Sequence, residues 1–305
     1  MSALRGGAAP VPAARAGGID TAVGDDLEAA RDALLSRGWC RFGHDPALAA
    51  WVEAVLPHAC AVATDPAARA AWLRSGGTWF AGVNILPNGP DGSVAGAGSL
   101  PSVPPLAGRA MRFLRHTMGH GALPLDTAQL SICYPGYPAA PQPDESPAAF
   151  RYRRTRDAAH VDGLERDAER RRRLGEAHAF ILGIPLVETQ PDAAPFSIWE
   201  GSHTLMRDAF HARLADVRVE AWAAEDVTDA YIDARRRVFE TCTRVTLTAA
   251  PGEAYVAHRL SLHGVAPWPG PTGVDAWRPV IYFRPELPRR GSDGSPDFAA
   301  WLALP

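Results

Sequence analysis

The chain has 305 residues, of which 47% are hydrophobic and 21% are charged, which is ordinary composition for a globular protein with a sizeable core. Its formal net charge of −3 gives no support to a role in binding nucleic acid or a membrane surface. All 31 basic residues are arginine, and this excludes chemistry that needs a lysine, such as Schiff-base formation.

The N-terminal residues 1–23 are interrupted by Arg, Gly and Pro, so we expect a disordered leader rather than a signal peptide. We find no apolar run of the length that a membrane span needs. The cysteines Cys40, Cys60, Cys133 and Cys242 are widely separated and form no CxxC pair, which predicts free thiols in a reducing compartment. We therefore expect a cytoplasmic protein.

Residues 24–124 are predicted to be mainly helical. Apolar residues at helical spacing indicate helices near 25–38, 47–64 and 105–121, with Pro57 kinking or ending the second. Trp39-Cys40-Arg41-Phe42 is expected to form a short strand, and residues 86–105, rich in Gly and Pro, a loop.

From Gln129 onward the character of the sequence changes. Short runs rich in Ile, Val, Leu, Tyr and Phe are bounded by Pro and Gly and predict strands; they are QLSICYP, AHAFILGIPLV, PFSIWEG, RVTLTA, EAYVAHRLSLHG and RPVIYFR. A charged segment near 220–242 is expected to be an inserted helix. Helices followed by strands predict one α+β domain over 24–305, with a β-sandwich or barrel over 125–287.

The triplet His160-Val161-Asp162 is the first candidate for chemistry. Residues i and i+2 of a strand project to the same face, so this histidine and aspartate would meet at one point. With one more histidine they would form a facial triad, which leaves three positions on iron open for a chelating co-substrate and dioxygen.

The candidates for the second histidine ligand lie in the run GEAYVAHRLSLHGVAP. The Gly252-Glu253 turn leads into an apolar strand at whose end stand His263 and Gly264, where the glycine would leave room for a metal or ligand. His258, in the middle of the same strand, is the alternative ligand, and we prefer His263.

Arg278 opens the next predicted strand. A 2-oxoglutarate molecule that chelates iron through its keto acid end needs a buried partner for its distal carboxylate, and arginine suits that geometry. Arg284 has the same strand parity and is the second choice. Gln129 and Tyr134 are weaker candidates for contact with the co-substrate, on whichever face of QLSICY is turned inward.

The ordered motifs HVDG, IPLVETQPDAAPFSIWEGSH, GEAYVAHRLSLHG and RPVIYF resemble those of the phytanoyl-CoA dioxygenase family of iron(II)- and 2-oxoglutarate-dependent oxygenases, over roughly residues 125–287. The chain departs from the family in having Glu253 at the acidic position of the turn. It also has Tyr134 where the family often has lysine, and Val265 and Trp268 where it often has serine or asparagine.

The resemblance implies a double-stranded β-helix (jelly-roll, cupin-like) core with N-terminal helices packed on it. It implies iron(II) held by His160, Asp162 and His263, the co-substrates 2-oxoglutarate and O2, and a carboxylate bound by Arg278. The implied activity is the hydroxylation of a small molecule with conversion of 2-oxoglutarate to succinate and CO2. In this family the histidine that corresponds to His203 is structural.

Two other functions stay open. One is a cupin-like metalloenzyme that uses zinc or manganese without 2-oxoglutarate, and the other is a non-catalytic β-sandwich that binds a ligand. A halogenase would lack the carboxylate of Asp162. The arginine runs at 151–156 and 170–173 are either solvated helix faces or a positive rim that recruits an anionic substrate, such as a carboxylate or an acyl-CoA. The oligomeric state and the identity of the substrate are not encoded in any motif.

Overall fold

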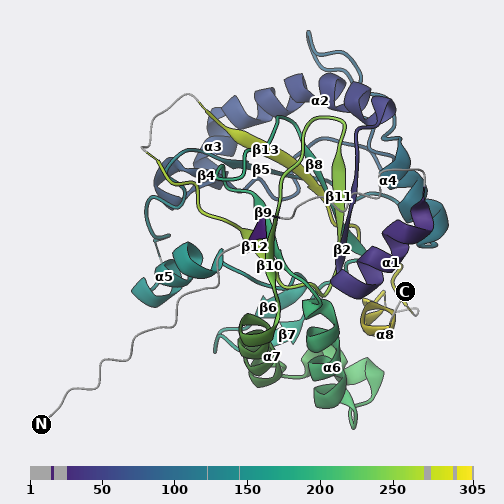
Figure 1. Cartoon of the computed structure of the whole chain (residues 1–305), viewed down its shortest axis with the longest axis vertical. Helices are drawn as coiled ribbons and strands as arrows, with labels where there is room; N and C mark the ends of the chain where they lie inside the picture. The colour runs from purple at the N-terminus through teal and green to yellow at the C-terminus, as the bar shows by residue number, and fades with distance from the viewer. Residues whose placement is uncertain are drawn as a thin grey trace, which may run out of the picture.

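The computed structural model describes residues 15–16, 26–121, 123–143, 145–270, 276–290 and 294–303 (Figure 1). Most of the predicted leader, 1–23, lies outside the described residues, except that Arg15–Ala16 form strand β1. The other strands are β2 (Trp39–Phe42), β3 (Leu73–Arg74), β4 (Trp79–Phe80), β5 (Gln129–Cys133), β6 (Leu164–Arg166), β7 (Arg172–Leu174), β8 (Phe180–Pro185), β9 (Phe196–Trp199), β10 (Arg244–Leu247), β11 (Ala254–His258), β12 (His263–Val265) and β13 (Arg278–Phe283).

The described residues also form helices. They are α1 (Leu27–Arg37), α2 (Pro46–Thr64), α3 (Pro66–Trp72), α4 (Arg109–Arg112), α5 (Pro147–Arg156), α6 (Ser202–Leu214), α7 (Thr228–Thr241) and α8 (Phe298–Leu302), with 3-10 turns at Ser75–Gly77 and Val219–Ala224 and a π-helical turn at Phe113–Thr117. Helices and sheets together confirm the predicted α+β class.

Two sheets form the body of the molecule. The larger has the order β2-β11-β8-β13-β5-β4-β3, and the smaller has the order β1-β10-β9-β12. Their inner faces share one apolar cluster, in which Phe196 and Ile198 of the smaller sheet pack with Ile181 and Val280 of the larger. The sheets therefore pack face to face. This packing is compatible with a double-stranded β-helix, which stays a prediction.

The outer face of the large sheet is covered by the N-terminal helices, as α2 shows in Figure 1. Helix α2 begins after Asp45, whose side chain accepts a hydrogen bond from the Ala47 N–H (2.9 Å), a regular N-cap. The expectation that Pro57 would end this helix is wrong, because the helix continues to Thr64. Its buried residues on both sides of the proline, among them Val55 and Ala59, hold it on the sheet.

By length and composition alone, α2 is apolar enough to cross a membrane, which corrects the expectation that no such run exists. Seven of its residues are buried against the protein, as in a core helix.

The short strand predicted at 39–42 is β2, and the part before residue 125 also contributes β3 and β4 to the large sheet. One prediction about the chain's organisation needs correction. The run at 170–173 does not lie on a helix face, because it enters a β-hairpin formed by β6 and β7. Helix α7, which lies within the expected insertion at 220–242, packs beside α6 under this hairpin (Figure 1).

Candidate metal and co-substrate site

His160 and His263 are joined through their backbones. The His160 N–H donates to the His263 carbonyl (2.8 Å), and the His263 N–H donates to the His160 carbonyl (3.0 Å). This isolated antiparallel bridge sets the ring centroids 4.6 Å apart. The expected strand through His160 is thus reduced to a single bridge, and Asp162 follows in a turn. One extended residue is enough to direct both side chains to the same point.

The structure brings His160, Asp162 and His263 together, with their potential ligand atoms all within 4.8 Å of one another. Asp162 Oδ1 lies 3.2 Å from His160 Nε2, and Asp162 Oδ2 lies 3.6 Å from His263 Nε2. In both histidines Nδ1 faces a backbone carbonyl, that of Ala158 (3.0 Å) or Ser261 (2.9 Å), so Nδ1 carries the proton and donates it. Both Nε2 lone pairs are therefore available to a metal.

The protonation states of His263 and Asp162 suit a metal site, whereas, against the effect of burial, the Asp162 carboxylate raises the pKa of His160. Burial lowers the pKa of His263 to about 4, so its ring is neutral at neutral pH. Burial also disfavours the charged form of Asp162, but the neighbouring His263 and Arg284 hold the pKa of its carboxyl well below the usual range. A neutral imidazole and an ionised carboxylate are the forms that bind a metal.

We had expected His263 to stand at the end of the strand that contains His258. Instead, that strand, β11, ends at His258, and His263 begins the next strand, β12, after a turn. Gly264 also has a different role from the one expected. A Cβ atom at this position would collide with the backbone carbonyl of Asp157, to which the Val265 N–H donates a hydrogen bond (3.2 Å). The glycine thus admits the chain segment that leads to His160, and it also lines the cavity at the cluster.

We therefore expect Gly264→Ala to destabilise the protein by roughly 1–3 kcal/mol, because the Asp157 backbone has to move. The measurement is the free energy of unfolding in urea. Gly43→Ala is the matched control, since a Cβ there meets nothing within 4 Å. Equal stability of the two variants would show that the Asp157 segment moves at no cost.

The alternative ligand, His258, lies outside the cluster. Its ring packs against that of His203, with centroids 4.8 Å apart, and its Nδ1 accepts a hydrogen bond from the Leu260 N–H (3.1 Å). His203 Nε2 donates to the Leu35 carbonyl (2.9 Å). Both rings are buried parts of the scaffold.

These two rings should make stability depend on pH. Burial, together with the nearby Arg259, holds the pKa of His258 well below its usual value, and burial lowers the pKa of His203. Below about pH 6.5 the unfolded chain binds protons that the folded chain does not, so stability is full above that pH and falls as the pH decreases.

We expect His258→Leu to flatten this dependence between pH 7 and 5.5, by up to about 1.4 kcal/mol per pH unit. Urea unfolding of the wild type and the variant at both pH values measures the difference. An unchanged slope in the variant would place the proton uptake elsewhere.

A cavity of about 230 Å³ opens onto the cluster. Its lining comes from both sheets and from the segments between strands: Trp79, Val83, Gln129, Ser131, His160, Asp162, Ile181, Phe196, His263, Gly264, Val265, Tyr282 and Arg284. The ring of Phe196 stacks on that of His263, with centroids 5.3 Å apart. The cavity thus has polar ligand atoms on one side and mostly apolar walls elsewhere.

Of the two weaker candidates for co-substrate contact, the structure brings only one to this cavity. Gln129 lines it and donates from Nε2 to the Ala81 carbonyl (3.0 Å). Tyr134 packs against the core beneath the N-terminal helices, on the opposite side of the sheet. A role for Tyr134 in binding the co-substrate is therefore not supported.

Arg278 is buried, with 1% of its surface exposed, and stands at the start of β13 opposite Cys133. One of its terminal nitrogens donates to the Ala194 carbonyl, while Nε and the other terminal nitrogen have no hydrogen-bond partner among the described residues. No carboxylate of the described chain forms an ion pair with it. An uncompensated buried charge is costly, so this guanidinium fits an anion that binds next to it.

Arg278 does not line the cavity. It shares a face of β13 with Tyr282, and Tyr282 does line the cavity. Its partner Ala194 is two residues before the lining residue Phe196. The buried guanidinium therefore lies beyond one wall of the cavity, on the side of β13 that faces the metal cluster.

Arg284, the second choice for the carboxylate, has a partner in the cluster. Its guanidinium donates to Asp162 Oδ2 (3.2 Å). Hydrogen bonds of this kind orient the carboxylate ligands of metals. This contact lets Arg284 orient Asp162 and leaves Arg278 as the arginine of the two that has no counter-ion among the described residues.

Sequence reasoning missed most of the cavity wall. Tyr282 could have been found, because it shares strand parity with Arg278, but Trp79 lies in β4, a two-residue strand that carries no periodic signal. The predicted loop at 86–105 contributes no residue to the lining of this cavity or of the two larger ones beside it.

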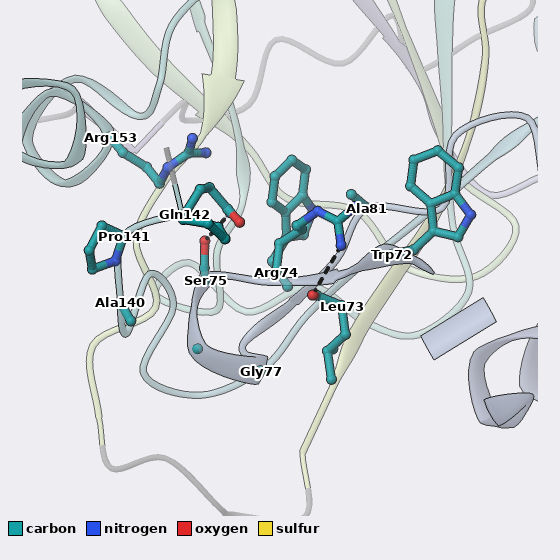
Figure 2. A pocket seen from close by; sticks show the side chains of 13 residues that line it. Trp72, Leu73, Arg74, Ser75, Gly77, Ala81, Ala140, Pro141, Gln142 and Arg153 are labelled. Carbon is teal, nitrogen blue, oxygen red and sulfur yellow. Dashed lines mark hydrogen bonds between the residues drawn. The ribbon is translucent and has the colours of Figure 1, made fainter. Parts of the chain in front are cut away.

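Two larger cavities adjoin this one. A cavity of about 880 Å³ shares Trp79 with it and is lined by residues 72–81 and 140–143 (Figure 2). In Figure 2, Gln142 donates to the Ser75 hydroxyl (3.1 Å), which ties the two lining segments together. A cavity of about 580 Å³ shares His160 with the metal cavity and Arg153 with the larger one. The three cavities are therefore linked through shared lining residues next to the cluster.

Comparison with protein-family models gives no match, and comparison with curated proteins gives none either. Among solved structures, the chain is similar to AviO1 from Streptomyces viridochromogenes (17% identity, 88% of this chain and 98% of that chain, TM-score 0.42). It is also similar to SnoK, a non-heme α-ketoglutarate-dependent carbocyclase from nogalamycin biosynthesis (14%, 88% and 92%, TM-score 0.43).

A third similar structure is the epimerase SnoN in complex with Fe3+, α-ketoglutarate and nogalamycin RO (16% identity, 88% of this chain and 94% of that chain, TM-score 0.41). Similarities of this size do not establish a family or an activity for this chain. Its function has to be inferred from its own residues.

Proposed function

We propose that this protein is an iron(II)- and 2-oxoglutarate-dependent oxygenase that hydroxylates a small molecule. One observation carries the proposal: a cluster of two histidines and an aspartate lines a cavity together with Tyr282, which shares a face of β13 with a buried arginine that has no counter-ion among the described residues. A metal cluster by itself fits several metals and reactions. The arginine adds the need for a carboxylate, which 2-oxoglutarate meets.

Each residue has a distinct task in this proposal. His160, Asp162 and His263 would hold iron(II), and Arg284 would orient Asp162. Arg278 would bind the distal carboxylate of 2-oxoglutarate, while Phe196 and Ile181 keep water away from the cavity. When bound, iron(II) and 2-oxoglutarate supply the activation of dioxygen, of which one atom enters succinate and the other enters the substrate as an alcohol.

The test is a screen of small metabolites for succinate formation, with iron(II), 2-oxoglutarate and air. We expect a low basal release of succinate that rises with a true substrate and is absent in Asp162→Ala. Iron binding without any binding of 2-oxoglutarate would contradict the proposal and support the cupin-like metalloenzyme. If neither binds, the non-catalytic β-sandwich is the better description.

A further inference from the structure

The cavity of about 580 Å³ beside the metal cluster is lined by five arginines, Arg153, Arg166, Arg170, Arg172 and Arg235. It meets the metal cavity at His160, whose side chain is 52% exposed. A molecule bound among the arginines would therefore extend past the exposed side of a candidate metal ligand.

Most of the positive charge in this cavity is not neutralised. Arg153 forms an ion pair with Glu145 (2.9 Å). The other four, which we call the arginine basin (Arg166, Arg170, Arg172 and Arg235), have no ion pair with any carboxylate in the described parts of the chain. This excess of charge distinguishes the basin from an ordinary surface.

The run at 170–173 shows the contrast within four consecutive residues. Arg171 pairs with Asp226, and Arg173 pairs with Asp167 (3.1 Å). Arg170 and Arg172, at the alternate positions, line the cavity without such partners. Arg172 and Arg173 are consecutive residues of β7, so their side chains point to opposite sides of the strand, whereas Arg170 lies in the bend before β7 with φ 62°. The carboxylate that pairs with Arg173 is therefore on the side away from Arg172.

The fold also sets like charges against each other. Arg166 and Arg172 are directly opposed in the β6–β7 hairpin, an arrangement that destabilises a sheet. The Arg172 guanidinium lies 4.6 Å from the ring centroid of Tyr231, and that of Arg235 lies 4.8 Å from the centroid of Tyr152. Stacking on tyrosine faces holds these groups in place and leaves their N–H edges free for a ligand.

We propose that the arginine basin binds a phosphate or diphosphate group of the substrate and so places the rest of the molecule beside His160. This inference rests on the proposed function and names the substrate class. A single carboxylate would neutralise only one of the four charges. A phosphate ester carries close to two negative charges at neutral pH, and three acceptor oxygens that several guanidinium groups can share.

The experiment measures binding of pyrophosphate to the metal-free full-length chain by isothermal titration calorimetry. We expect Arg166→Gln/Arg172→Gln to weaken this binding at least about tenfold. Arg171→Gln/Arg173→Gln is the matched control, because it removes the same charge from the same hairpin on the other side, and it should leave the affinity within about twofold. Arg235→Gln, on a helix, serves as a second variant if the hairpin variants do not fold.

Equal weakening by the two double variants would overturn the inference, because it would show only a general attraction of anions. Binding of succinate as tight as that of pyrophosphate would overturn it too, in favour of a carboxylate. The variants of the basin should still bind iron(II) and 2-oxoglutarate. If the wild type binds iron(II) and 2-oxoglutarate but not pyrophosphate, the inference about the arginine basin is refuted and the proposed function is not. If the wild type binds pyrophosphate but not iron(II) and 2-oxoglutarate, the proposed function is refuted.

Discussion

We expect Asp162→Ala to abolish the binding of iron(II) at the cluster. The variant keeps both imidazoles but loses the only anionic ligand of the triad, and Arg284 then presents an unpaired guanidinium to the site. Changing a residue that merely supports a metal ligand costs about 10–100-fold in affinity, so removal of a ligand should cost at least about 100-fold. Anaerobic titration calorimetry with iron(II) measures the loss.

Two control variants make this result specific. Glu176→Ala removes another carboxylate that contacts a histidine, His178 (3.0 Å), but lies outside the cluster, and it should leave iron binding unchanged. His258→Leu tests the alternative ligand and should also keep the iron. If His258→Leu lost iron while His263→Ala retained it, our choice of the distal histidine would be wrong.

Arg278→Gln has the second large effect, on 2-oxoglutarate rather than on iron. Truncating one partner of a buried charge pair costs about 2–5 kcal/mol, so the affinity for 2-oxoglutarate should fall at least about 30-fold, with iron affinity within about twofold of wild type. Without ligand the variant should be no less stable than wild type, because it removes a buried charge that lacks a counter-ion. Titration calorimetry and thermal unfolding measure the two properties.

Arg284→Gln is the comparison for this prediction. Because Arg284 contacts Asp162, its replacement should weaken iron binding more than it weakens the binding of 2-oxoglutarate to the iron-loaded protein. The opposite pattern, with Arg278→Gln harmless and Arg284→Gln deficient in 2-oxoglutarate, would exchange the roles of the two arginines.

The spacing of His160 and Asp162 predicted that both side chains would meet, and they do, although by a single bridge rather than a strand. What the spacing could not show is the partner of that bridge. His263 lies 103 positions further along the chain and supplies both a candidate ligand and the backbone that holds His160. Such pairing between distant segments depends on the tertiary fold, which local periodicity does not report.

The surroundings of Gly264 could not be predicted from the sequence either. A glycine beside a candidate ligand suggested room for a metal, whereas the space is filled by the carbonyl of Asp157. The arginine basin was only partly foreseen, since its residues come from a hairpin and from helix α7, and the sequence does not show that Arg172 and Arg235 stack on the same tyrosine. Arg278 and Arg284 have the same parity in the sequence, but β13 ends at Phe283, and of the two only Arg284 lines the cavity.

In the proposed function, one site binds iron(II) and 2-oxoglutarate together. The most direct test is the visible absorption of the anaerobic wild-type protein when 2-oxoglutarate is added to its iron(II) form, because chelation of iron(II) by the keto acid produces a weak charge-transfer band. We predict that the band appears in the wild type and is absent in Asp162→Ala. A wild-type protein that binds iron(II) but shows no band at saturating 2-oxoglutarate would contradict the account.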